Sequence, residues 1–471
     1  MSFDNLGLME PLTRARAAAK YTEPTTVQEQ AIPAALAGKD VMVSSRTGSG
    51  KTASFMLPAL TLVLKAREEQ RLARVQQTPA QGRDAQAPEQ GRGRRDQRFD
   101  GPRSYTKPTG PRVLVLCPTR ELAMQVAKAA MDYGRYVPNL TVATVVGGVP
   151  YPAQLTALRG PLDILIATPG RLIDHIGAGK AVLDNIQLLV LDEADRMLDM
   201  GFIDDINHIA SNTPKTRQTV MFSATFAGAT GNLAKELLRE PLRIDVAGHT
   251  DTHADIEQRL HWADDFMHKN ALLDHILTGR EVDQALVFTS TQRDAEVLAD
   301  RLAELGHSVE ALHGGMPQGR RNRVLQNMRS QRVRVLVATD VAARGLDVPT
   351  ISHVINFGLP MKEEDYVHRI GRTGRAGRTG LAVTLAERRD FGMIQRIQRF
   401  TTQRMPVATI TGLEPKRVEP KATARPGGAP AGKFGKPFGA RSGAPGAGFG
   451  GKPFRPAGAG YVKKGPARPS R

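Results

Sequence analysis

Short runs of aliphatic residues recur along this 471-residue chain, and they restrict its fold more than any other feature. The runs are rich in β-branched residues and do not alternate with polar ones, and each leads through a loop into a helical pattern. Such strands are buried on both faces, which indicates parallel sheets built from βαβ units. The first series consists of Val41–Val43, Val113–Leu116, Val142–Val146, Ile164–Ile166, Leu188–Leu191 and Val220–Phe222, and the second of Ala285–Phe288, Val309–Leu312, Val333–Ala338, Val354–Ile355 and Leu381–Leu385. Two series predict two tandem α/β domains with parallel sheets.

The polar stretch near residues 247–253 lacks apolar periodicity and separates the two series. We therefore expect a first domain over 30–246 preceded by a short region 1–29, a linker over 247–257 and a second domain over 258–411. Residues 66–111 are rich in Gln, Arg, Gly and Pro, which predicts a largely disordered insertion in the first domain. Residues 412–471 are dominated by Gly, Pro, Ala, Lys and Arg, which predicts a disordered basic tail.

The positive charge is concentrated in those two appendages. The formal net charge is +18, and residues 421–471 alone hold 11 Lys/Arg and no Asp/Glu, with five aromatic residues spaced among them. Residues 66–112 add a net +5, so the predicted folded body is nearly balanced. This asymmetry favours binding to a polyanion, although a solvated tail would have the same composition.

The chain is predicted to be cytoplasmic, without membrane association. Its single cysteine, Cys117, excludes a disulfide framework and reads as a small core residue. The N-terminus lacks the basic and apolar regions of a signal peptide. No apolar run approaches the roughly 18 residues of a membrane span.

A phosphate-binding loop follows the first predicted strand. Its glycines let backbone N–H groups wrap an oxyanion, Lys51 can reach the β- and γ-phosphates, and the Thr52 hydroxyl can bind Mg²⁺. The first glycine of the usual pattern is Ser45 here. The residues predicted to hold the nucleotide are Ser45, Arg46, Thr47, Gly48, Ser49, Gly50, Lys51 and Thr52.

Acidic and basic residues complete the predicted site. Asp192 ends a buried strand, where its carboxylate can hold the metal, and Glu193 can orient or deprotonate an attacking water. Arg372 and Arg375 lie three residues apart and can neutralise a γ-phosphate from a second domain. The alternatives are a solvated helix start for the acidic run and a surface ion pair for the arginines. We assign catalytic roles to Lys51, Glu193, Arg372 and Arg375.

The polar runs follow the carboxyl ends of the predicted strands, where ligands bind in open α/β sheets. Such runs on two sheet edges predict two sheets that face one another across a cleft. Nucleotide bound there would be contacted by both domains.

An ordered set of motifs resembles the DEAD-box RNA helicase family over nearly all of residues 1–410. Besides the runs above, the set includes Pro118-Thr119-Arg120-Glu121-Leu122-Ala123, Gly147-Gly148, Thr168-Pro169-Gly170-Arg171, Asp192-Glu193-Ala194-Asp195, Ser223-Ala224-Thr225, Ala338 to Asp347 and His368 to Arg375. The segment Tyr21 to Gln28 resembles the family's adenine-reading Q motif, with Thr26 where proline is more usual. The N-terminal sequence and the compact core most resemble those of the bacterial RhlE-like branch of the family.

The resemblance implies two RecA-like domains, ATP and Mg²⁺ as cofactors, and RNA as the partner. It implies that Gln28 reads adenine, that Tyr21 stacks on it and that Asp347 contacts the ribose. It also implies that Ser223 and Thr225 bond Asp195 and, with His368, couple the nucleotide state to the second domain. The residues implied to hold the RNA backbone are Arg120, Gly148, Thr168, Arg171 and Thr339.

The function expected from this resemblance is ATP-driven, local and non-processive unwinding of short RNA duplexes, or remodelling of RNA–protein complexes. A nucleotide-gated RNA clamp or assembly factor, and an RNA chaperone whose tail anneals strands, are the alternatives. A DNA helicase fits less well, because the Gln28 and Ser223 motifs resemble the RNA branch. Partners in ribosomal precursors or in RNA decay are both compatible with the sequence.

Overall fold

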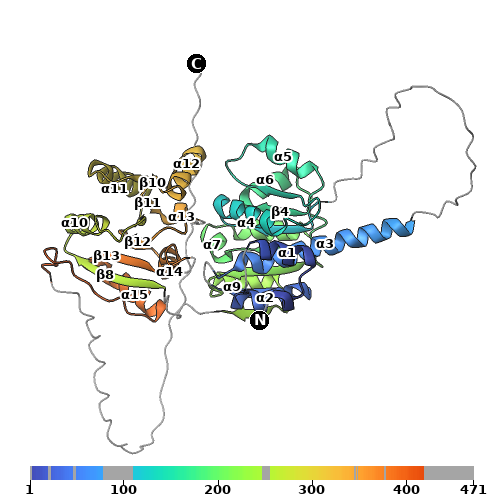
Figure 1. The fold of residues 1–471 in the computed structure, drawn as a ribbon, viewed down its shortest axis with the longest axis horizontal. Helices are drawn as coiled ribbons and strands as arrows, with labels where there is room; N and C mark the ends of the chain where they lie inside the picture. The colour runs from blue at the N-terminus through green and yellow to red at the C-terminus, as the bar shows by residue number, and fades with distance from the viewer. Residues whose placement is uncertain are drawn as a thin grey trace, which may run out of the picture. The chain divides into compact units, whose positions relative to one another are not determined.

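A computed structural model describes residues 3–19, 23–45, 49–77, 110–246, 255–343, 346, 348–375 and 378–417. The described part of residues 1–420 forms one compact unit that contains two parallel sheets (Figure 1). Nothing in the described residues is a helix long and apolar enough to cross a membrane. The predicted class, two tandem α/β domains with parallel sheets, is confirmed.

The first sheet has, within the described residues, seven strands in the order β3-β4-β2-β5-β6-β1-β7, and every pairing is parallel. Its strands are β1 (Val41–Ser44), β2 (Val113–Leu116), β3 (Val142–Val145), β4 (Ile164–Ala167), β5 (Leu188–Leu191), β6 (Gln218–Ser223) and β7 (Leu242–Asp245). Its helices are η1 (Phe3–Leu6), α1 (Glu10–Ala18), α2 (Thr26–Leu36), α3 (Lys51–Gln77), α4 (Arg120–Tyr133), α5 (Tyr151–Arg159), α6 (Pro169–Gly177), α7 (Ala194–Asp199), α8 (Ile203–Ser211) and α9 (Ala229–Leu237).

Both faces of this sheet are buried, as the unbroken aliphatic runs predict. Val113 and Val115 of β2 pack into a core with α2, α3 and α4. Leu114 and Leu116 of the same strand pack into a second core with α6, α8 and α9. Because successive side chains point to opposite faces, only a strand without polar positions can serve both cores.

The second sheet has six described strands in the order β10-β11-β9-β12-β13-β8, again all parallel. They are β8 (Ile256–Ala263), β9 (Ala285–Thr289), β10 (Val309–Leu312), β11 (Val335–Thr339), β12 (His353–Asn356) and β13 (Gly380–Glu387). The accompanying helices are α10 (Phe266–Leu277), α11 (Gln292–Glu304), α12 (Gln318–Arg329), α13 (Asp340–Ala343), α14 (Glu363–Ile370), η2 (Arg388–Asp390) and α15 (Phe391–Thr401). Strand β8 begins two residues before the predicted start of the second domain.

The prediction of disorder from residue 66 is wrong for its first part, because α3 continues to Gln77. Residues 66–77 contain Ala, Arg, Glu, Gln and Leu, which favour helix, and no Gly or Pro. Arg67 also fastens the helix: its guanidinium donates to the Asn139 carbonyl at 2.7 Å and to the Asp163 carboxylate at 2.6 Å. The rest of the predicted insertion, up to residue 109, lies outside the described residues.

The predicted tail is likewise ordered at its start. The Asp264 carboxylate accepts the backbone N–H groups of Lys416 and Arg417 at 2.8 and 3.0 Å. Leu413 packs against the core of the second sheet. These contacts, and the 2.9 Å contact of His268 Nε2 with the Leu413 carbonyl, hold residues 412–417 against the start of α10, whereas residues 418–471 and most of the predicted linker lie outside the described residues.

Candidate active site

The strand order divides the carboxyl edge of the first sheet into two halves. The phosphate loop follows β1, Asp192 follows β5 and Ser223 ends β6, and these three strands are adjacent. The motifs with Arg120, Gly148 and Thr168 follow β2, β3 and β4, which form the other adjacent set. Residues far apart in the sequence are thereby gathered into two halves of one edge: one holds residues predicted to bind nucleotide (the nucleotide half) and the other holds residues predicted to bind RNA (the RNA half).

The phosphate loop is fastened to the neighbouring strand. The Ser45 N–H donates to the Ser223 carbonyl at 3.1 Å, and Ser49 Oγ donates to Ser45 Oγ at 3.2 Å. Lys51 begins α3, is nearly buried, and donates from Nζ to the Ser45 carbonyl at 3.3 Å. A lysine ammonium and a helix N-terminus lie together here, which suits a phosphate group. Five predicted nucleotide residues lie outside the described residues: Tyr21, Arg46, Thr47, Gly48 and Asp347.

Gln28 binds the phosphate loop directly. Its Nε2 donates to the Gly50 carbonyl at 3.2 Å, and its Oε1 accepts the Thr25 N–H at 3.0 Å. Thr25 Oγ1 in turn donates to the Ser49 carbonyl at 2.8 Å. Gly50 has a φ of +86°, and a Cβ at this position would lie 2.4 Å from Gln28 Nε2. The amide predicted to read adenine therefore also sets the shape of the loop.

Asp192 and Glu193 lie at the end of β5 in unusual surroundings. Burial raises the pKa of Asp192 to about 7, although Lys51 opposes the rise. Asp192 Oδ1 is buried and has no hydrogen-bond partner among the described residues. Glu193 takes a left-handed backbone conformation, φ 52° and ψ 53°, which is strained for a non-glycine residue and recurs at functional sites. A buried carboxylate oxygen without a partner is suited to bind a cation. The sequence predicts that Asp192 and Thr52 hold Mg²⁺ at this position.

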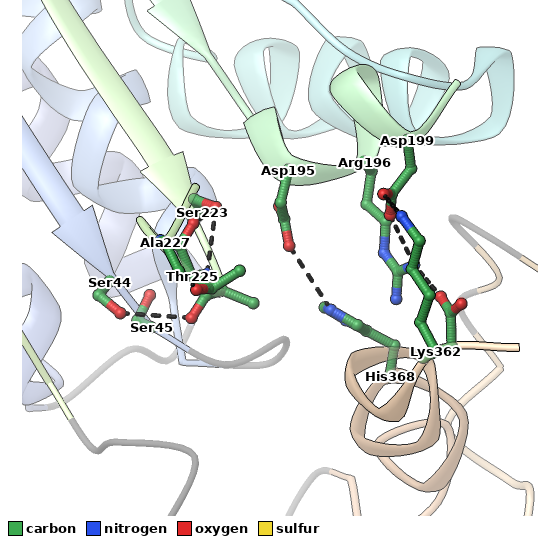
Figure 2. Close-up of polar contacts among 12 residues, drawn as sticks. Ser44, Ser45, Asp195, Arg196, Asp199, Ser223, Thr225, Ala227, Lys362 and His368 are labelled. Atoms are coloured by element: carbon green, nitrogen blue, oxygen red, sulfur yellow. Dashed lines mark hydrogen bonds and ion pairs between the residues drawn. The ribbon is translucent and has the colours of Figure 1, made fainter. Parts of the chain in front are cut away.

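Asp195 contacts the second domain rather than the residues predicted to bond it. His368 Nε2 of α14 lies 3.6 Å from Asp195 Oδ2 (Figure 2). Burial would raise the pKa of Asp195, but His368, Arg196 and Lys51 outweigh it and lower that pKa. Burial, aided by Arg196, lowers the pKa of His368, so its imidazole is neutral at neutral pH.

The predicted bonds from Ser223 and Thr225 to Asp195 are not among the contacts of the described residues, and both hydroxyls bond locally instead. Ser223 Oγ donates to the Thr225 carbonyl at 2.6 Å, and Thr225 Oγ1 accepts the Ala227 N–H at 3.2 Å. These local turns satisfy the hydroxyls within their own segment, as short Ser/Thr side chains often do. Figure 2 shows the two residues turned toward each other and away from Asp195.

Arg372 and Arg375 are brought together as the sequence predicts. Their Nη1 atoms donate to the same Leu346 carbonyl, at 3.0 and 3.1 Å. Arg372 Nε also donates to the His368 carbonyl at 3.2 Å, so the residue that meets Asp195 is linked to the first arginine. The assignment of both arginines to the γ-phosphate stays a prediction.

The predicted RNA residues of the first sheet lie on neighbouring loops. Arg120 Nη1 donates to the Gly147 carbonyl at 3.2 Å, and a Cβ on Gly148, whose φ is +72°, would lie 2.9 Å from that same nitrogen. Arg171 Nη1 donates to the Val149 carbonyl at 3.3 Å. Thr168 lies immediately before α6. These side chains gather at one edge.

Thr339 ends β11 of the second sheet and is buried. Glu121, beside the RNA residues of the first sheet, accepts Arg321 Nη2 of α12 at 2.9 Å. The RNA half of the first sheet therefore contacts the second domain, as the nucleotide half does through Asp195.

Several charged residues in these contacts were not predicted from the sequence. Arg196 of α7 pairs with Asp365 of α14, and Lys362 Nζ lies 2.5 Å from Asp199. Arg369 binds the Asp340 carboxylate with two nitrogens, at 2.6 and 2.7 Å. The signal available in the sequence was a charged residue directly after Asp195 and an opposite charge one helical turn before His368.

Comparisons with known proteins agree with this geometry. The DEAD/DEAH box helicase family model matches residues 25–232, and that of the helicase conserved C-terminal domain matches residues 268–377. The chain is 39% identical to the ATP-dependent RNA helicase SrmB of Escherichia coli over 420 residues, covering 89% of this chain and 86% of SrmB.

Solved structures are similar over both domains. S. cerevisiae Dbp5 bound to RNA and ADP BeF3 matches with a TM-score of 0.72 and 28% identity, covering 86% of this chain and 95% of the other. A variant of Dbp5 bound to Gle1 and IP6 covers 86% of this chain and 94% of the other, also at 28% identity, but with a TM-score of 0.64.

Proposed function

This chain belongs to the DEAD-box family of ATP-dependent RNA helicases, and from that premise we propose that its ATP hydrolysis drives local, non-processive separation of short RNA duplexes or remodelling of RNA–protein complexes. The observation that carries the proposal is the contact between Asp195, on the nucleotide half of the first sheet, and His368 of the second domain. Through it, the state of the nucleotide can bias the arrangement of the two domains.

In this proposal the first domain carries out the chemistry. Lys51 neutralises phosphate charge, and Glu193 orients or deprotonates the attacking water. Asp192 and Thr52 hold Mg²⁺, which supplies positive charge to the phosphate oxygens when bound. The buried, unpartnered Asp192 oxygen and the raised pKa of its carboxyl support this assignment, because a cation would compensate the buried charge.

Closure adds the second domain to the site. Arg372 and Arg375 then contact the γ-phosphate, while Gln28 reads adenine and Asp347 contacts the ribose. Asp195, Ser223, Thr225 and His368 pass the state of the nucleotide between the domains. The local turns of the two hydroxyls are consistent with a rearrangement on binding, since a hydroxyl can rotate to a new partner.

RNA binds without reading its sequence. Arg120, Gly148, Thr168, Arg171 and Thr339 suit phosphate and 2′-OH contacts, which position a strand but carry no base information. We also propose that the basic tail, 421–471, holds RNA near the core and that the protein acts in the cytoplasm. Ribosomal precursors and RNA-decay complexes remain the two candidate partners, and membership of the RhlE-like branch stays a prediction.

The test is strand separation on RNA and DNA duplexes of increasing length, with and without ATP, for the wild type and Lys51→Ala. We expect ATP-dependent separation of short RNA duplexes that declines steeply with length and is absent in Lys51→Ala. Separation of long duplexes at an undiminished rate would contradict the non-processive proposal. ATP-dependent RNA binding without separation would favour a clamp, and separation or annealing that ignores ATP would favour a chaperone.

A further inference from the structure

Two short helices from different domains, α7 and α14, meet through three pairs of polar side chains. Helix α7 carries Asp195, Arg196 and Asp199, which meet in that order His368 and Asp365 of α14 and Lys362 directly before α14. In the Arg196–Asp365 and Asp199–Lys362 pairs each charge meets its opposite, and in the third pair a neutral imidazole faces the Asp195 carboxylate. Figure 2 shows Asp195, Arg196 and Asp199 on one ribbon, with His368 and Lys362 reaching toward them from the other.

The middle pair is far more buried than the outer one. The Arg196 side chain is 4% exposed and that of Asp365 is 12% exposed, whereas Lys362 in the outer pair is 59% exposed. Burial alone would lower the pKa of Arg196, but Asp365 and Asp195 outweigh it and raise that pKa. Arg196 therefore stays charged. An unpaired charge buried to this degree would cost far more than an exposed one.

The same pair is positioned to align the catalytic groups. Arg196 directly follows Asp195 on α7, and Asp365 lies one helical turn before His368 on α14. His368 is linked to Arg372, because the His368 carbonyl accepts a hydrogen bond from Arg372 Nε. The contact between Asp195 and His368 is itself loose at 3.6 Å, with a neutral imidazole. A strong neighbouring pair is needed to hold α14 in one register against α7.

We propose that Arg196 and Asp365 are positioning residues that stabilise the closed, RNA-bound arrangement and align Arg372, with Asp199 and Lys362 as a weaker outer pair. This inference rests on the proposed closure of the two domains around nucleotide and RNA. Both ion pairs are thereby assigned to the closed, active arrangement of the two domains rather than to a resting one. The higher TM-score against Dbp5 bound to RNA and ADP BeF3 than against the variant bound to Gle1 and IP6 supports that choice.

The decisive measurement is RNA affinity in two nucleotide states, ADP–beryllium fluoride with Mg²⁺ and ADP with Mg²⁺. Asp365→Asn keeps the shape and leaves Arg196 without its main partner only when the domains are closed. Truncating a buried pair weakens an interface by roughly 30-fold or more. Asp199, 3.6 Å from the same guanidinium, compensates in part. We therefore expect about a tenfold loss of RNA affinity with ADP–beryllium fluoride and none with ADP.

Matched variants separate the pair from general charge effects. Glu364→Gln removes the same charge from the neighbouring position of α14 and should leave RNA affinity unchanged in both states. Lys362→Met should weaken affinity no more than about fivefold, as for an exposed pair, and Lys362→Arg should restore it. Arg196→Met should match Asp365→Asn, and the double variant should be no worse than either single one, because both remove one interaction. Thermal unfolding of each variant checks the fold, and Asp365→Asn alone suffices if Arg196→Met does not fold.

Three results would overturn the inference. Unchanged RNA affinity in Asp365→Asn would show that the pair contributes nothing to closure. Tighter RNA binding would place the pair in a resting arrangement. Independent, multiplying losses in the double variant would show that the two residues do not act together. RNA-stimulated ATPase of the wild type tests the proposed function separately: if it is present while Asp365→Asn is normal, only the inference about the pair fails.

Discussion

Gly50→Ala should be more damaging than its size suggests, because Gly50 lies where the phosphate loop meets Gln28 of the segment predicted to read adenine. The φ of +86° alone costs an alanine about 1–2 kcal/mol. The new Cβ would also lie 2.4 Å from Gln28 Nε2 and 3.0 Å from Thr25 Oγ1, so the Gln28 side chain must move. Its two hydrogen bonds, to the Gly50 carbonyl and from the Thr25 N–H, are then lost at about 1 kcal/mol each.

Gly38→Ala is the matched control. Its φ is +76°, but a Cβ there would have no atom within 4 Å, so it has the backbone strain without the collision. In urea unfolding, Gly50→Ala should lose roughly 2 kcal/mol more than Gly38→Ala. ATP affinity, measured with a fluorescent nucleotide, should fall in Gly50→Ala alone. Adding Gln28→Ala removes the collision, so the double variant should cost less than the two single losses together. Equal losses in Gly50→Ala and Gly38→Ala would refute the argument that Gln28 shapes the loop.

Four further changes test other parts of the protein. Glu193→Gln keeps the shape of the side chain but removes the base, so ATP and RNA should still bind while ATPase turnover collapses; normal turnover would refute the assignment. Arg372→Ala should lose RNA-stimulated ATPase by roughly 10³-fold or more with little change in ATP affinity, and retained stimulation would contradict a role at the γ-phosphate. Deleting residues 421–471 should raise the RNA concentration for half-maximal ATPase and flatten its salt dependence while saturated turnover stays constant; superimposable curves would exclude an RNA tether. Arg67→Ala should lower the free energy of unfolding by roughly 1–3 kcal/mol through the lost Asp163 and Asn139 bonds, with Arg71→Ala, whose partner Glu68 is exposed, as the neutral control in urea unfolding.

Every strand except one edge strand of each sheet was predictable from the sequence. Every predicted aliphatic run forms a strand, because burial on both faces leaves an unbroken apolar signal. Strand β7 was missed because only Ile244 of its four residues is buried. Strand β8 was missed because Glu257, Gln258 and Arg259 interrupt its apolar residues. Each strand lies at one end of its sheet, where a single neighbour and partial solvent exposure permit polar residues.

For the site, the sequence predicts which residues come together but does not predict which atoms bond to each other. The sequence predicts that Lys51 and Asp192 gather at one sheet edge, because parallel strands place their following loops together. It does not predict that the Ser223 hydroxyl bonds within its own turn instead of reaching Asp195. Both arrangements satisfy a hydroxyl, so the choice depends on distances that residue types do not contain.

The pairing of Arg196 with Asp365 shows why the sequence alone did not predict this contact between domains, although both charged residues were visible in it. Arg196 has a local partner three residues away, Asp199, at 3.6 Å, so α7 taken by itself reads as a short helix with its charges satisfied. A local pair, however, does not explain why an arginine should be 4% exposed, because an isolated helix would leave its guanidinium in water. Only a second element that both covers the side chain and supplies a carboxylate resolves this, and α14, 169 positions along the chain, does both. The burial of Arg196 is thus evidence for the contact between domains, and its charge is the reason why Asp365→Asn should weaken RNA binding only in the nucleotide state that closes them.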